Sequence, residues 1–84
     1  MVKKEEDAYR EKIEVMIKHI KQKKNTAEQL ARDDAEYMAE NFMAKSEETI
    51  EEISSRYVSF RSWRSKAYAY GEVVEDLESL LYSQ

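Results

Sequence analysis

Apolar residues near the start of the chain recur at the spacing of one helical face. The spacing i, i+4, i+7, i+8, i+11 is kept by Tyr9, Ile13, Met16, Ile17 and Ile20. This pattern predicts an amphipathic helix over about residues 3–24. Its end is indicated by a lysine run that leads into Asn25 and Thr26.

A second helix is predicted over about residues 26–45. Asn25 with Glu28, or Thr26 with Gln29, has the spacing of a capping box, in which two side chains satisfy the free amides of a helix start. One side of this helix is small and rich in alanine, which predicts close packing against a neighbour. That side consists of Ala27, Leu30, Ala31, Ala35, Met38 and Phe42.

A third helix is predicted over about residues 47–82, with Ser46 as its cap and two glutamates in its first turn. Without glycine or proline nearby, the chain could also continue as helix through Ser46. From Phe60 the apolar residues step alternately by three and four, which is the rhythm of a coiled coil. The step from Tyr57 to Phe60 to Trp63 is three and then three, so we expect a stammer and a bend near residues 58–62.

These elements predict an all-α fold in a single domain, residues 1–84. We expect a bundle of three or four helices with a long C-terminal, coiled-coil-like helix. That helix would be roughly 54 Å long at 1.5 Å per residue, and the two earlier helices only about 35 Å and 30 Å. A homodimer would cover the excess, and a bend that folds the helix back is the alternative. The predicted dimer seam consists of Phe60, Trp63, Tyr70, Val74, Leu77 and Leu81.

Composition narrows the chemistry that the chain can perform. The 84 residues include no cysteine, and this absence excludes disulfides and thiolate metal sites. The chain has one histidine, His19. With a single glycine, the chain cannot form a glycine-rich phosphate-binding loop. No serine has a His/Asp pair available that would make it a catalytic nucleophile. No apolar run approaches the ~20 residues of a membrane span, and no signal peptide is recognisable. We therefore expect a soluble cytoplasmic protein with no metal and no cofactor.

Charge is segregated into blocks along the chain. Residues 1–24 carry a net charge of +3, residues 25–53 −7, residues 54–71 +4 and residues 72–84 −4. Alternating blocks favour antiparallel pairing of helices, because the acidic middle can then lie beside basic neighbours. Blocks of one sign can also steer a charged partner.

Two surfaces are candidates for partner binding. The first is acidic, and its carboxylates could imitate nucleic-acid phosphates and occupy a basic groove of another protein; the alternative is a solvated face that keeps the protein soluble. Its residues are Glu36, Glu40, Glu47, Glu48 and Glu51. The second lies in the basic–aromatic stretch 56–70, with Arg56, Arg61, Arg64 and Lys66 as exposed candidates. Arginines beside aromatic rings can grip single-stranded nucleic acid, but the net charge of −4 disfavours a dedicated nucleic-acid binder.

Glu47, Glu48 and Glu51 spell E-E-x-x-E. This resembles the first half of the motif of the all-α nucleoside triphosphate pyrophosphatases of the MazG type. In that family a later E-x-x-D completes a magnesium site against the triphosphate. Here Glu72 is followed by Glu75, and Asp76 comes one place late. The resemblance implies a magnesium-dependent pyrophosphatase as an alternative function.

The tyrosine-rich stretch 67–75 in a short, acidic, cysteine-free helical chain resembles in type the small accessory proteins of bacteriophages and mobile elements. The resemblance implies a non-enzymatic protein that binds a host protein, for example an anti-CRISPR-type inhibitor of a nucleic-acid-processing or defence enzyme. We therefore expect a protein-binding module that does not bind a membrane and that works as a homodimer.

Overall fold

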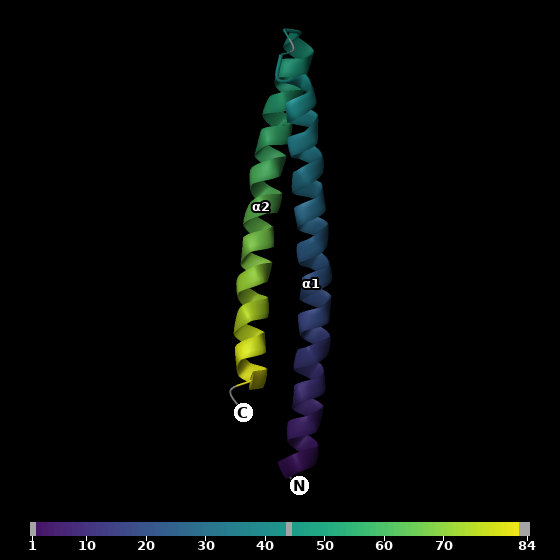
Figure 1. The fold of residues 1–84 in the computed structure, drawn as a ribbon, viewed down its shortest axis with the longest axis vertical. Coiled ribbons are helices and arrows are strands. Elements are labelled where there is room, and N and C mark those ends of the chain that lie inside the picture. The colour runs from purple at the N-terminus through teal and green to yellow at the C-terminus, as the bar shows by residue number, and fades with distance from the viewer. Residues whose placement is uncertain (1, 44, 83–84) are drawn as a thin grey trace.

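The chain folds as a hairpin of two long antiparallel helices, α1 (Val2–Asn41) and α2 (Glu47–Tyr82). The computed structural model describes residues 2–43 and 45–82, with side chains from residue 7 onward. In Figure 1 the helices lie side by side, with both termini at one end, called here the open end, and the turn at the other. The molecule is a rod with extents of 68 × 16 × 14 Å.

The all-α class is confirmed, but the predicted bundle of three or four helices with a long C-terminal helix was wrong. Residues 3–24 and 26–45, expected to form two helices, belong mainly to the single helix α1. This helix has 40 residues and α2 has 36, so the C-terminal helix has a partner of its own length within the chain. It therefore needs neither a second chain nor a bend to cover its length.

The expected helix break at residues 25–26 was wrong because the polar side chains there make contacts typical of a helix interior. The Thr26 hydroxyl donates a hydrogen bond to the Gln22 carbonyl, 3.1 Å away, instead of capping a new helix. The Gln29 amide donates to Asp33 one turn later, at 2.8 Å. Ala27, the first apolar residue after the expected break, is only 1 % exposed. The packing face of α1 thus continues through this segment.

Each helix contacts the other through one row of residues, which we call its seam. The residues of both seams given below are all buried or half-buried. The spacing alternates between three and four along each row, as in a coiled coil. The α1 seam consists of Ile13, Ile17, Ile20, Lys24, Ala27, Ala31, Asp34, Met38 and Asn41. The α2 seam consists of Ile53, Arg56, Phe60, Trp63, Ala67, Tyr70, Val74, Leu77 and Leu81.

The expected stammer disappears once Arg56 is given the seam position that an apolar pattern assigns to Tyr57. Tyr57 is 51 % exposed, whereas Arg56 contacts α1. The spacing from Ile53 to Arg56 to Phe60 to Trp63 is then three, four and three, and α2 is helical throughout residues 58–62.

The aliphatic core lies toward the open end. Ile13, Ile17, Val74 and Leu81 form a buried cluster, against which Ile20 and Leu77 pack. At this end Lys21 pairs with Glu78 at 3.2 Å, so the basic start of α1 lies beside the acidic end of α2. The antiparallel arrangement expected from the charge blocks is therefore the one observed.

Local hydrogen bonds mark the end of α1 and the start of α2 on either side of the turn. The Asn41 side chain, in the last turn of α1, donates to the Tyr37 carbonyl one turn earlier at 2.8 Å. The Ser46 carbonyl accepts the Ile50 amide at 3.0 Å, and Glu47 and Glu48 occupy the first turn of α2. Among the described residues, neither helix has a stretch long and apolar enough to cross a membrane.

Candidate functional site

The hairpin brings the predicted acidic residues together around its turn. Glu36 and Glu40 lie on the last turns of α1, and Glu47, Glu48 and Glu51 lie on the first turns of α2. All five side chains are exposed. We call these five glutamates, with the turn between them, the acidic tip. Residues 33–52 contain eight acidic residues and one basic residue, so this end of the rod is strongly negative.

Two large apolar side chains stand at the acidic tip, and sequence reasoning missed them as surface residues. Phe42 is 75 % exposed and Met43 is 73 % exposed. The apolar pattern assigned Phe42 to a packing face. That face ends at Asn41, however, where α1 itself ends, and only the position of the turn reveals this. The tip therefore combines exposed apolar groups with a rim of carboxylates.

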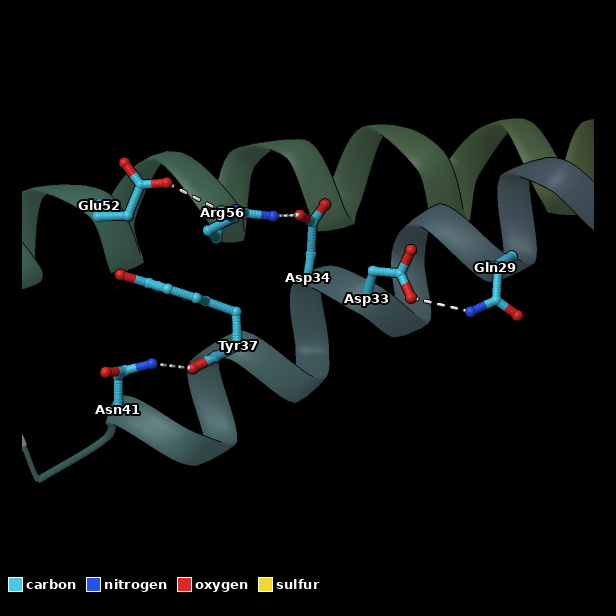
Figure 2. A network of polar contacts seen from close by, with 7 residues as sticks. All are labelled: Gln29, Asp33, Asp34, Tyr37, Asn41, Glu52 and Arg56. Carbon is cyan, nitrogen blue, oxygen red and sulfur yellow. Dashed lines mark hydrogen bonds and ion pairs between the residues drawn. The ribbon is translucent and has the colours of Figure 1, made fainter.

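Arg56 makes its polar contacts within the hairpin, although its side chain is still 39 % exposed. Figure 2 shows its side chain reaching from α2 to Asp34 on α1. Its Nη1 lies 3.1 Å from Asp34 Oδ1 and its Nε lies 3.1 Å from Glu52 Oε1. The guanidinium carbon stands 4.8 Å from the centre of the Tyr37 ring. Hydrogen bonds from Arg56 to Asp34 and then to Glu52 raise the pKa of Arg56 above its ordinary value, so it stays cationic over any usable pH range.

Asp34 is the buried partner in this network. Its residue exposure is 5 %, and Oδ2 has no hydrogen-bond partner among the described residues. A buried carboxylate held by a single cation depends strongly on that cation, because removing it leaves an unpaired buried charge. The network therefore fixes how the two seams align near the turn, and Arg56 has a structural role that sequence reasoning did not assign to it.

The other predicted basic residues line the outer surface of α2. The Arg64 guanidinium carbon lies 5.9 Å from the Phe60 ring centre and 5.7 Å from that of Tyr68. Its Nη2 donates to the Tyr68 hydroxyl at 3.4 Å, and this hydrogen bond raises the pKa of Arg64. Lys66 Nζ stands 4.4 Å over the Trp63 ring. Arg61 is exposed and lines a hollow of about 360 Å³ together with Phe60, Arg64 and Tyr68.

The six residues of the predicted dimer seam all lie on the α2 seam, against α1 of the same chain. Ala67, between them, is 9 % exposed. This surface is thus already used within the hairpin.

The acids that resemble the pyrophosphatase motif are spread along α2. Glu51 and Glu72 are separated by about 31 Å at 1.5 Å per residue, so one chain cannot bring both to one magnesium ion. No group of three or more potential metal ligands occurs among the described residues. His19 is exposed on α1 beside a shallow hollow with Trp63 and Tyr70.

A larger hollow of about 410 Å³ lies where Gly71 leaves the hairpin surface open. The Lys24 stem crosses it, with Cε 3.6 Å from where a Cβ on Gly71 would stand. Cations (Lys24, Arg64) and acids (Glu28, Glu72, Glu75) both line it, so its charge favours neither an anion nor a cation.

Comparison with known proteins gave no match to a protein family, to a curated protein or to a solved structure. The function of the chain is therefore inferred from its residues and their geometry.

Proposed function

We propose that the chain is a non-enzymatic protein-binding module that engages a partner through its acidic tip. The supporting observation is the pair Phe42 and Met43, exposed at 75 % and 73 % between carboxylates from both helices. Single exposed apolar residues are ordinary on protein surfaces. Two adjacent large ones at the end of a rod, on a tip that also carries five exposed glutamates, form a distinct surface.

The chemistry of this tip specifies the kind of partner. A large apolar side chain that enters a pocket supplies much of the affinity of an interface, and charges around it exclude wrong partners and speed association. The complementary surface is an apolar pocket rimmed by lysine or arginine. The basic groove of a nucleic-acid-processing or defence protein has this character, and the tip would occupy it as an inhibitor.

Nucleic acid is the less favoured partner. The tip repels phosphates, and three of the four predicted basic residues are engaged with rings or carboxylates. The remaining possibility, binding through stretch 56–70, makes a separate prediction: oligonucleotide affinity that falls steeply with salt.

The test uses site-specific photo-crosslinking in the native host. A photoreactive phenylalanine analogue replaces Phe42 in one variant of the full chain and exposed Ala69 in another. We expect a protein to be captured at position 42 and not at position 69. Its purified form should bind the chain with an affinity that weakens as salt is raised, because opposite charges are screened.

Charge reversal supplies the matched control. Reversing four tip residues to lysine (Glu36, Glu40, Glu47, Glu48) should abolish capture, and circular dichroism should report an unchanged helix content. Reversing four exposed acids toward the open end (Glu11, Glu14, Glu72, Glu75) changes the net charge equally and should leave capture intact. Equal loss in both variants would refute a specific tip, as would capture that survives tip reversal.

A further inference from the structure

One row of α1 remains partly uncovered beside its seam. The row lies one residue before alternate seam positions and repeats every seven residues as Tyr9, Met16, Lys23, Leu30 and Tyr37. Tyr9 is 58 % exposed and Met16 is 48 % exposed, while Leu30 and Tyr37 are half-buried. The helix α2 covers mainly the seam that faces it, and its Arg56 also lies over the Tyr37 ring. The remainder of this largely apolar row, with Tyr9 and Met16 the most exposed, stays open to a further partner.

The row has the symmetry of an interface between identical chains. Read in either direction from Lys23, it gives an aliphatic side chain (Met16 or Leu30) and then a tyrosine (Tyr9 or Tyr37). Two antiparallel copies of α1, related by a two-fold axis at Lys23, would place each Met16 against Leu30 of the second copy. Each Tyr9 would then meet Tyr37. Self-complementarity of this kind is what a two-fold interface requires.

Charge selects the antiparallel arrangement. Residues 1–24 carry +3 and residues 25–53 carry −7. Antiparallel copies of α1 place the basic half of one beside the acidic half of the other, whereas parallel copies would bring both acidic tips together. In the antiparallel register Lys12 of one copy also falls beside Asp33 of the other. Like charges brought together oppose association, so the parallel arrangement is disfavoured.

The exposed area of the hairpin is sufficient for such a contact. The chain exposes 6942 Å², whereas a compact monomer of its mass of 10.0 kDa exposes about 5,200 Å². The excess is about twice the ~800 Å² that one partner buries in an interface of standard size. No large side chain among the described residues is less than 2 % exposed, so the single hairpin encloses little.

We infer that two copies of the chain pair through this row of α1 into an antiparallel four-helix bundle, with their acidic tips at opposite ends. Lys23 sits on the two-fold axis, where its long stem can reach solvent. This pairing is independent of what the acidic tip binds. It also assigns self-association to a surface other than the α2 seam.

Sedimentation equilibrium at several concentrations tests the pairing. The unmodified chain should show twice its mass of 10.0 kDa. Met16→Glu should weaken dimerisation by about 100-fold, because each dimer would bury two carboxylates without partners. Val15→Glu is the matched control, since Val15 is the adjacent residue and is 68 % exposed outside the row. Lys23→Leu, which completes the apolar row, should tighten the dimer.

A monomeric chain whose Lys23→Leu variant is also monomeric would overturn the inference, and so would equal effects of Met16→Glu and Val15→Glu. Because the chain has no cysteine, single cysteines report the direction of pairing. Lys23→Cys should form an inter-chain disulfide under oxidation. Met16→Cys should not, because antiparallel copies place the two Met16 positions about 21 Å apart along the axis, beyond disulfide reach. Equal cross-linking at both positions would contradict the antiparallel arrangement.

Discussion

The two ends of the hairpin use opposite kinds of residues at equivalent seam positions. Near the open end the seams meet through isoleucine, valine and leucine, and the cluster around Ile17 and Val74 is the aliphatic core. Near the turn the same positions are taken by Asp34 and Arg56, which form an ion pair. Apolar packing is strong but tolerates a shift of register, whereas a buried charge must meet its partner. We conclude that the open end supplies most of the stability and the turn end fixes the alignment.

The largest expected effect is at the open end. Ile17 is 8 % exposed within the aliphatic core, so Ile17→Ala should lower the free energy of unfolding by about 2–5 kcal/mol. This is a large share of the roughly 5–15 kcal/mol typical of a whole protein. Urea denaturation followed by circular dichroism at one fixed protein concentration measures it. Val15→Ala, on the exposed face, is the control, and an equal loss there would contradict the division between the ends.

The next effect tests the ion pair at the turn end. Arg56→Leu should destabilise the hairpin less than Ile17→Ala but clearly, because it leaves the Asp34 carboxylate buried without a cation. Asp34→Leu should lower the free energy of unfolding by less, because Arg56 keeps its ion pair with Glu52 and its contact with solvent. The double variant should be as stable as the original chain or more stable. A double-mutant cycle from urea denaturation reports the coupling, and additive losses would mean that the pair has no role in alignment.

A smaller effect, of opposite sign, is expected between the two ends. Gly71 is helical without positive φ, and an added Cβ would meet Lys24 Cε at an ordinary contact distance of 3.6 Å. Gly71→Ala should therefore raise the free energy of unfolding by up to about 1 kcal/mol through helix propensity. Thermal unfolding would register a higher midpoint. A lower midpoint would indicate that the hollow over Gly71 must stay open.

The smallest effect concerns the exposed ion pair at the open end. The side chains of Lys21 and Glu78 are 55 % and 36 % exposed, so solvent screens their attraction. Lys21→Ala should change the free energy of unfolding by less than about 0.5 kcal/mol. Urea denaturation at low and high salt would reveal any contribution. If Lys21→Ala lowered the free energy of unfolding as much as Arg56→Leu, the expected difference between the exposed and the buried ion pair would be contradicted.

Much of the fold was accessible from the sequence because apolar periodicity is a direct record of packing. The bounds of α2 coincide with the predicted third helix, and the seam from Phe60 to Leu81 is the packed face. The errors arose where polar residues occupy seam positions. Lys24 breaks the apolar pattern in α1, and Arg56 breaks it in α2, yet both lie on the seams.

The candidate site was predicted less completely. The exposed glutamates of the tip follow from composition and helical spacing. The role of Arg56 could not be foreseen, because its partner Asp34 lies 22 residues earlier on the other helix. Phe42 could be assigned to the surface only once the end of α1 was known. The role of Arg56 and the exposure of Phe42 both depend on where the chain reverses direction. The pattern of apolar and polar residues does not fix that point between Asn41 and Ser46.

The place of the Asp34–Arg56 pair near the turn also has a consequence for the order in which the chain folds. Contact between these residues closes a far shorter segment than contact between Arg10 and Leu81, which are 71 residues apart, and closing a shorter loop costs less entropy. We therefore expect the ion pair to form early and the aliphatic end to join last, as in a zipper. Aligned first at the turn, the remaining residues would meet their correct partners without a search through shifted pairings.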